Sequence, residues 1–386
     1  MEQRIAFIHD WKSGSYLFSS LCEAYGVSRQ TGYNLIRKFK RFGIDGLDDV
    51  RSRPHHQPTA TPAVVVAKIV ELRTTPGKEH WGARKLAVKL RESFGQDQVP
   101  SIVTINNILR REGLIIQRKQ RRRVKPLSPI FAPKQCNEIW SADYKGKFRM
   151  GNAKYCHPLT IADSYSRFVL RAKGMYHERF TAARPVFRQV FREFGMPLQL
   201  HTDNGSPFGS VQSPGRFGRL SYWLIDLGIQ PVFSDPGCPQ QNGRHERMHR
   251  DLKRACTQPV GYDPRAQNRI LNAFVQHYNE ERPHEALDMA TPASQHVYSP
   301  RAYPERIEPA QYDEQLVVKR VTNNGAVRWG SYEYVIITDC LGGKHVGFER
   351  IGGRSWKVYY RDTLLGYFST DREVNRGKYY KLRSDA

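Results

Sequence analysis

The stretch that decides the fold is "EIWSADYKGKF" at residues 138–148. It is strand-like, yet it carries Asp143 in the middle, where a carboxylate is disfavoured unless it has a role. Residues 155–172, "YCHPLTIADSYSRFVLRA", supply two more strands joined at "DSYS". Alternating helices and strands follow up to residue 257, so we expect a mixed α/β sheet over this part of the chain.

A second acid stands at the end of a strand. "PLQLHTDNG" (197–205) is a short apolar run that ends at Asp203. Open α/β sheets place their sites at the carboxyl ends of the strands, so this position favours function. Asn204 and Gly205 permit the tight turn that would hold the carboxylate at the sheet edge.

A third acid lies on a helix. In "GRHERMHRDLKRACT" (243–257), the buried stripe is predicted to be Met248, Leu252 and Ala255. At about 100° per residue, Glu246 faces away from that stripe. We expect it on an exposed basic face together with His249, Arg250 and Lys253, and with Arg244 nearby.

Three carboxylates from separate elements suit a metal centre. Mg²⁺ is a hard cation that binds carboxylates together with substrate phosphate oxygens, and Mn²⁺ can replace it. Two such ions about 4 Å apart can activate an attacking oxygen and stabilise the leaving oxygen at phosphorus. Asp143, Asp203 and Glu246 are therefore the candidate catalytic and metal-binding residues, with two ions per site. No Ser or Tyr nucleophile is needed.

Structural alternatives exist for each acid. A mid-strand Asp143 can be a buried hydrogen-bond acceptor, "TDNG" is a good turn by itself, and Glu246 can pair with Arg250 at i+4. Asp163 and Asp235 are rival carboxylates. Asp163 ends the second strand, where it is either structural or an accessory metal contact.

The chain begins with a helix-turn-helix pattern. In residues 15–42, Leu17, Leu21 and Ala24 mark one helical face, and Ser28 is a good N-cap for a second helix with Leu35, Ile36 and Phe39 at helical spacing. This pattern predicts a DNA-reading unit over residues 1–52, although an ordinary helical hairpin is the alternative. The residues that could reach bases or phosphates are Arg29, Gln30, Thr31 and Asn34.

A second helical unit is expected over residues 62–116. Its last helix follows a Ser101 cap and carries Ile105, Ile108 and Leu109, with Arg110 and Arg111 outward. It is either a second, helix-turn-helix-like DNA-binding domain or a spacer bundle. Residues 117–134 combine a charge run with prolines, which is typical of a linker. This basic linker could follow a DNA backbone through Arg121, Arg122 and Arg123.

The last part of the chain, residues 312–386, is rich in strands. Asn324-Gly325 is a hairpin signal, and further short strands with turns follow it. We expect a small β-barrel with basic edges that suit DNA, or that simply form a soluble surface.

Composition points to a polyanionic partner. The 386 residues include 61 Lys and Arg against 37 Asp and Glu, a formal charge of +24, which favours nucleic acid. Six scattered cysteines without a C-x-x-C pair indicate reduced thiols and argue against a structural zinc site. No secretory signal or membrane span is expected.

The motifs "WSADYKGKF", "HTDNGSPF", "PGCPQQNGRHERMHRDLKRA" and "YNEERPHEAL" occur in order. Together they resemble the catalytic core of bacterial insertion-sequence transposases, the DDE group related to retroviral integrases. The resemblance is strong over roughly residues 130–300. It implies an RNase H-like core over residues 135–300 with the triad on Asp143, Asp203 and Glu246, and it matches Asn242-Gly243 before the third acid.

One feature departs from that pattern. The third acid follows the second by 43 residues, longer than in compact retroviral cores. The surplus lies in the Gly- and Pro-rich residues 206–219, and a loop insertion costs little free energy.

The resemblance also implies an activity and partners. We expect a multidomain DNA transposase that binds transposon ends, cleaves their 3′ ends with water and joins them to target DNA. The alternatives are a DNA-binding regulator derived from a transposase and an RNase H-like nuclease without strand transfer. Double-stranded DNA is the expected partner, with at least a dimer on paired ends, no membrane, and a cytoplasmic, nucleoid-associated location, in a bacterium. A stripe of Ile270, Leu271, Phe274 and Tyr278 could pack on its own core or on a second subunit.

Overall fold

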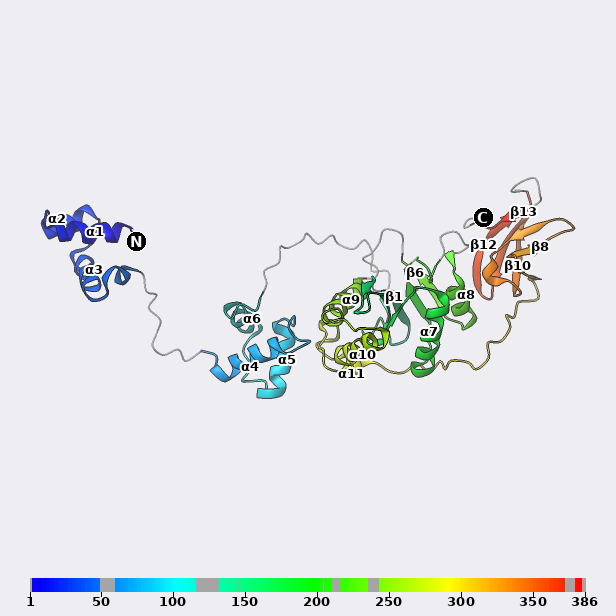
Figure 1. Ribbon diagram of the computed structural model, residues 1–386. Helices are drawn as coiled ribbons and strands as arrows, with labels where there is room; N and C mark the ends of the chain where they lie inside the picture. The colour runs from blue at the N-terminus through cyan, green and yellow to red at the C-terminus, as the bar shows by residue number, and fades with distance from the viewer. Residues whose placement is uncertain are drawn as a thin grey trace. The chain divides into compact units, whose positions relative to one another are not determined.

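The computed structural model describes residues 2–48, 60–115, 132–144, 146–203, 205–209, 216–234, 243–371 and 379–383. It contains two compact units, Met1–Pro62 and Ala63–Ala386. Figure 1 shows their elements along the chain. Several residues singled out by the sequence lie outside the described residues: Arg121, Arg122, Arg123, Asn204, Asp235, Cys238 and Asn242.

The first unit consists of α1 (Glu2–Ser13), α2 (Phe18–Ala24), α3 (Arg29–Phe42) and a 3₁₀ turn (Gly43–Leu47). The predicted helix pair is α2 and α3, and Ser28 caps α3 by accepting a bond from the Thr31 N–H. Of the predicted face of α2, Leu21 is buried, but Leu17 precedes the helix and is 78% exposed, and Ala24 is exposed as well. Cys22 is buried in their place. α1 was not predicted, and it contributes Phe7 to this core.

The predicted second helical unit is present as three helices. These are α4 (Ala63–Thr74), α5 (Ala83–Phe94) and α6 (Ile102–Arg111). Ser101 accepts a bond from the Thr104 N–H and so caps α6 as expected. The helices enclose a separate apolar core that includes Ile69, Trp81, Leu86, Leu90 and Ile105.

The central sheet has the predicted mixed character. Its strands are β1 (Ile139–Tyr144), β2 (Phe148–Arg149), β3 (Tyr155–Asp163), β4 (Val169–Met175), β5 (Gln199–Thr202) and β6 (Gln230–Phe233). Across the sheet the order is β4, β3, β1, β5, β6. The pairings among β4, β3 and β1 are antiparallel, whereas β1, β5 and β6 run parallel. β2 pairs with the start of β3.

Helices cover both faces of this sheet (Figure 1). On one face, α7 (Phe180–Phe194) and α8 (Arg219–Asp226) pack on Trp140 and Leu200. On the other face, α9 (Gly243–Cys256) and α10 (Pro264–Glu280) share a core with Val169. Short turns follow at Glu285–Leu287 and Pro292–Gln295 (α11). The stripe of α10 packs within its own chain, since Leu271, Phe274 and Tyr278 belong to that same core.

The C-terminal strands form two sheets. They are β7 (Val317–Arg320), β8 (Ala326–Arg328), β9 (Tyr334–Ile336), β10 (His345–Gly352), β11 (Ser355–Tyr360), β12 (Thr363–Ser369) and β13 (Tyr379–Lys381), with a 3₁₀ turn at Asp339–Leu341. The sheet orders are β12-β11-β10-β7 and β13-β9-β8. A closed barrel is therefore not confirmed over the described residues. The predicted turn at Asn324-Gly325 is present. The strands on either side of it pair with other strands, β7 with β10 and β8 with β9.

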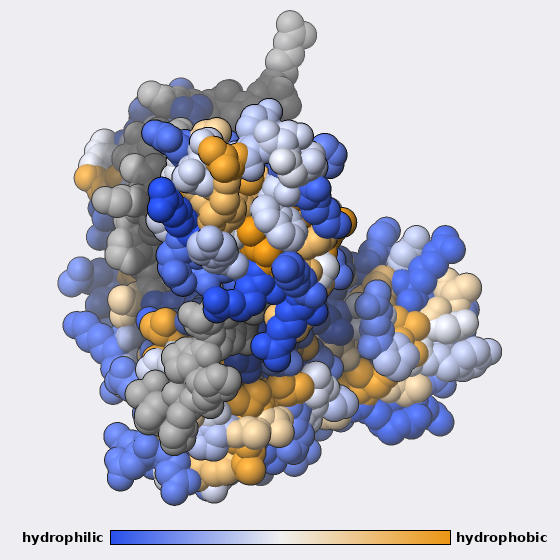
Figure 2. All heavy atoms as spheres, turned by 90° about the vertical axis from the view of Figure 1, so that its left-hand side faces the viewer, coloured by the Kyte–Doolittle hydropathy of each residue, from blue (hydrophilic) through white to orange (hydrophobic). Residues whose placement is uncertain are grey.

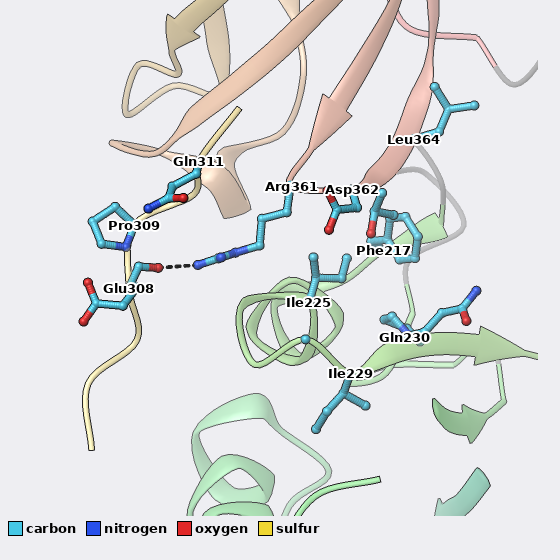
Figure 3. Close-up of a pocket in the computed structure, with 13 residues that line it drawn as sticks. Phe217, Ile225, Ile229, Gln230, Glu308, Pro309, Gln311, Arg361, Asp362 and Leu364 are labelled. Carbon is cyan, nitrogen blue, oxygen red and sulfur yellow. Dashed lines mark hydrogen bonds between the residues drawn. The ribbon is translucent and has the colours of Figure 1, made fainter. Parts of the chain in front are cut away.

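One acid ties these sheets to the central domain. Asp226 at the end of α8 bonds to Tyr360 and Lys344, and its Oδ1 lies 3.3 Å from Arg361 Nε. Arg361 also donates to the carbonyl of Glu308 across a cavity of about 840 Å³ (Figure 3). The junction is thus both charged and hydrophobic, because Tyr222 and Ile225 of α8 join the C-terminal core.

The surface agrees with the composition. The face shown in Figure 2 is mainly hydrophilic, with small separated apolar patches. None of the helices among the described residues is long and apolar enough to cross a membrane.

A buried ion pair holds the middle of α9. Asp251 is 6% exposed, and its Oδ2 lies 2.5 Å from Arg282 Nη2. His80, from the segment before α5, places Nε2 3.5 Å from Asp251 Oδ1. α9 is therefore held both by the chain after α10 and by the second helical unit.

We predict that Asp251→Asn lowers the free energy of unfolding by about 3–5 kcal/mol, because it leaves the Arg282 charge buried without compensation. Urea unfolding followed by tryptophan fluorescence measures this. As the control, Glu92→Gln removes one partner of the exposed Lys89 pair and should cost less than about 1 kcal/mol. Equal effects of the two changes would show that Asp251 is not a structural anchor.

Candidate active site

Asp143 faces the α9 side of the sheet. Trp140 and Ala142 of β1 belong to the core under α7, so the alternating residues Ser141 and Asp143 face α9. Ser141 confirms this orientation, since its Oγ lies 2.9 Å from Nδ1 of His245 on that helix.

Asp203 falls beside Asp143 by strand register. β1 and β5 are parallel, with Ser141 opposite His201. The paired register ends there, and Asp203 directly follows β5. Continued for two residues, the register would set Asp143 opposite Asp203 on the same face, at the carboxyl ends of strands about 4.8 Å apart.

Glu246 lies in the first turn of α9, between two anchored histidines. Nε2 of both His245 and His249 lies 2.6 Å from Thr160 Oγ1, and Thr160 pairs with Asp143 across the strands. His249 Nδ1 also lies 3.6 Å from Asp143 Oδ2. Glu246 is exposed and lies about 60° around the helix from His249, the residue that approaches Asp143.

The hydrogen bonds assign a proton to each atom of this network. Thr160 Oγ1 lies 3.0 Å from the Asp143 carbonyl, to which only the hydroxyl can donate. Its two lone pairs then accept from Nε2–H of both histidines, and His245 Nδ1 accepts from the Ser141 hydroxyl. Complete burial holds the pKa of His245 well below its ordinary value, so that ring is neutral.

The acids themselves favour a cation. Desolvation raises the pKa of the Asp203 carboxyl. The nearby charge of Glu178 raises this pKa further, whereas the hydrogen bond from the Gly205 N–H lowers it. Among the described residues, no Lys or Arg forms an ion pair with Asp203 or Glu246. The oxygen donors fit a hard divalent ion, which would relieve the repulsion between like charges.

A tighter ligand cluster lies at the other end of β1. In the described part of the chain, one group of possible metal ligands has all its ligand atoms within 4.8 Å of one another: Cys136, Asp163 and His296. Asp143, Asp203 and Glu246 do not form such a group there. Asp163 pairs with Trp140, about 10 Å along the strand from Asp143. Its oxygens accept bonds from the Asn137 N–H and from the Ser166 N–H and hydroxyl. These bonds support the structural alternative for Asp163.

Comparison with known families matches this architecture. Integrase core domain models match residues 133–239 and 227–292. A helix-turn-helix domain model matches residues 3–55, and a homeodomain-like domain model matches residues 31–109.

Residues 133–292 thus match the integrase core domain, and the chain is similar to proteins of bacterial insertion elements. It is 27% identical to the insertion element IS476 uncharacterized 39.2 kDa protein of Xanthomonas euvesicatoria, over 62% of this chain and 66% of that protein. It is also 27% identical to transposase InsD for insertion element IS2D of Escherichia coli (strain K12), over 64% and 81% of the two chains. The HTLV-2 integrase catalytic core domain in complex with magnesium aligns over 43% of this chain and 99% of its own, with 16% identity and a TM-score of 0.34.

Among the described residues, those expected to contact DNA are exposed, with one exception. Exposed side chains include Arg29, Gln30 and Asn34 on α3, Arg110 and Arg111 on α6, and Arg244, Arg250 and Lys253 on α9. His249 was predicted on the exposed face and is 5% exposed, because α9 rotates it toward Thr160. The buried stripe likewise continues through Cys256, while Ala255 is exposed.

The contacts of His245 and His249 with Thr160 were not predicted from the sequence. The signal was the spacing of His245 and His249, four residues apart on one helical face, opposite small hydroxyl residues in two strands. Gly205 was predicted for its backbone freedom, but the structure gives a different reason. A Cβ at this position would lie 3.1 Å from Asp203 Oδ2, while the Gly205 N–H lies 3.2 Å from Asp203 Oδ1.

We therefore predict that Gly205→Ala displaces the Asp203 carboxylate and weakens Mg²⁺ binding by roughly ten-fold, the lower end of the effect seen when groups that orient metal ligands are lost. Calorimetric titration of the protein with Mg²⁺ measures this. Gly243→Ala is the control, since a Cβ there has no neighbour within 4 Å among the described atoms. Unchanged Mg²⁺ affinity in Gly205→Ala would contradict the close-approach argument.

Proposed function

We propose that this protein is a DNA transposase that binds the ends of its element, cleaves the 3′ ends with water and joins them to target DNA. What supports the proposal is the β1–β5 register, which continued by two residues would put Asp143 beside Asp203, together with the histidine contacts that hold α9, the helix of Glu246, on the same face of the sheet. The charge of +24 supplies attraction for the polyanionic substrate.

Asp143, Asp203 and Glu246 would hold two Mg²⁺ or Mn²⁺ ions, which when bound supply charge for both the attacking and the leaving oxygen at phosphorus. In the first reaction a water oxygen bonds to phosphorus and the bond to the 3′ oxygen breaks, so the element end keeps a 3′ hydroxyl. In the second, that hydroxyl bonds to a target phosphorus and releases the 3′ oxygen of the target strand. Each reaction replaces one phosphodiester oxygen by another, and no covalent intermediate on the protein is required.

The chain's own residues would fix the geometry of these reactions. Thr160, His245 and His249 hold α9 against β1 and so set the position of Glu246 relative to Asp143. The neutral His245 adds no positive charge beneath the site. Arg250 and Lys253 project from the exposed side of α9, where they would bind backbone phosphates and orient the scissile bond.

The two helical units would read the element ends. α3 presents Arg29, Gln30 and Asn34 near its start, as recognition helices present base-contacting residues. We further propose that the active complex holds at least two chains on two ends. One active site handles one strand at a time, so the readers of one chain would hold the end that another chain cuts.

We predict that Asp143→Asn, Asp203→Asn and Glu246→Gln each reduce cleavage and joining at least 1,000-fold, a loss of about 4 kcal/mol of transition-state stabilisation. DNA binding should remain, because other surfaces hold the DNA. Gel assays of Mg²⁺-dependent nicking and joining, on the DNA that flanks the gene, measure both products.

Glu193→Gln on α7 removes an acid of the surface and should leave both reactions unchanged. A triad variant with near-normal activity would remove that residue from the site. Nicking without joined products in the native protein would favour a nuclease, and DNA binding without either reaction would favour a regulator.

The paired arrangement predicts complementation. Neither a Glu246→Gln chain nor a chain lacking residues 1–116 should join end DNA specifically, because one lacks chemistry and the other lacks readers. Their mixture should recover end-specific joining in trans. An active complex whose light-scattering mass corresponds to one chain on one end would refute this arrangement.

A further inference from the structure

The hairpin of β2 and β3 extends beyond the acids. β2 pairs with the start of β3, as β1 pairs with its later part, and the Met150 N–H donates to the Lys154 carbonyl at the turn. Tyr155 lies five residues before Thr160, the partner of Asp143. At about 3.4 Å per residue, it stands about 17 Å along the strand from the acid.

Cations stand over aromatic rings on this hairpin. Lys147 Nζ lies 4.8 Å and Arg149 Cζ 5.4 Å from the ring centroid of Tyr155. Lys154 Nζ lies 5.6 Å from that of Tyr176, the residue after β4. All three cations are exposed, and none of them forms an ion pair with a carboxylate among the described residues. The rings restrict the cations while leaving their charges available to a partner.

The hairpin is fixed to the chain that leaves α9. The Gly151 N–H donates to the Gly261 carbonyl at 3.0 Å, and the Asn152 N–H donates to the Tyr262 carbonyl at 2.9 Å. The approach is close, because a Cβ at Gly151 would lie 3.0 Å from Tyr262 Cα. Tyr262 is itself 70% exposed.

α9 connects this hairpin with the acids. The helix starts beside Ser141 and ends at Cys256, and the chain that follows it bonds to the hairpin through Gly261 and Tyr262. Arg250, Lys253 and Arg254 are exposed along it. Positive charge therefore continues from Glu246 to the hairpin.

We propose that Lys147, Arg149 and Lys154, the hairpin cations, bind backbone phosphates of duplex DNA about five base pairs from the cut phosphate. The spacing follows from about 17 Å along the β-strand and about 3.4 Å of rise along the DNA helix axis for each base pair. This assignment rests on the proposed function, since it takes the cut phosphate to lie at the acids. The tyrosines hold the cations in place, and an acidic protein is the partner that the test must exclude.

The test compares the native chain with Lys147→Gln/Arg149→Gln/Lys154→Gln. Fluorescence anisotropy measures its affinity for labelled duplex at several salt concentrations without divalent metal. Two probes are used: the DNA that flanks the gene, and a random-sequence duplex as target. Loss of three phosphate contacts should reduce the slope of log affinity against log salt by about 2.7, at about 0.9 for each contact.

The matched control is Arg188→Gln/Arg192→Gln/Arg306→Gln. It removes the same charge from exposed positions, including a cation that stands over a ring, Arg192 on Tyr303. The control should leave the slope within about 1 of the native value, since a slope change of about 0.9 corresponds to one contact. Equal slopes in the hairpin variant and the native chain would overturn the proposal, and so would an equal reduction in the control.

Hydroxyl-radical footprinting then locates the contact. The hairpin variant should lose protection about five base pairs from the cut site. Lys154→Arg should retain both slope and footprint, which separates charge from misfolding of the hairpin. Loss on the flanking DNA assigns the surface to the element end, and loss on the random duplex alone assigns it to the target. If the native chain binds both probes but cleaves neither with Mg²⁺, the proposed function fails. The salt dependence of binding by the hairpin variant would still show whether the hairpin cations contact phosphates.

Discussion

The hydroxyl of Thr160 is the point on which the site depends. It contacts the Asp143 carbonyl and both histidines of α9, so one buried atom sets the distance between strand and helix. A hydroxyl offers one proton and two lone pairs, and all three are used here. Any change in this bond moves Glu246 relative to Asp143, because a helix responds to its anchors as a rigid element. The arrangement positions an exposed carboxylate through buried contacts that the substrate never touches.

The helical period of α9 places its polar side chains on three faces with different contacts. His245 and His249 face the sheet, Asp251 faces Arg282 and His80, and Arg250 and Lys253 face solvent. Residues three or four apart share a face, whereas neighbours one or two apart diverge. The second helical unit thus contacts the helix that carries Glu246, through His80. The contact of His80 with Asp251 is therefore a direct physical connection between the second helical unit and the helix that carries Glu246.

The features that could be predicted from the sequence are those set by the local pattern of residues. The alternation in β1, the apolar runs before Asp203 and the caps at Ser28 and Ser101 all have local causes, and the structure reproduces them. Which face of α9 is buried depends instead on contacts with residues far away in the sequence. His249 is polar enough for a surface, and its burial is made favourable by partners far away in the sequence, such as the hydroxyl of Thr160, 89 residues away. The closed barrel is not confirmed over the described residues, because strand partners are set by contacts far apart in sequence: on either side of the Asn324-Gly325 turn, β7 pairs with β10 and β8 pairs with β9.

The long spacing between Asp203 and Glu246 also has a physical account. The described parts of the surplus loop divide between two cores: Phe208 packs under α7 and Phe217 packs with the C-terminal strands. A bridge between Gly209 and Phe217 brings the two parts together, and the Ser221 hydroxyl donates to the Phe208 carbonyl. α8, which follows this loop, then supplies Asp226 to the ion pairs of the C-terminal sheets. Extra chain in a compact core would add only entropy cost, but here it buries aromatic surface on both sides of a junction. The described ends of the insertion therefore contribute to the junction between the central sheet and the C-terminal sheets, and the register of β1 and β5 is undisturbed.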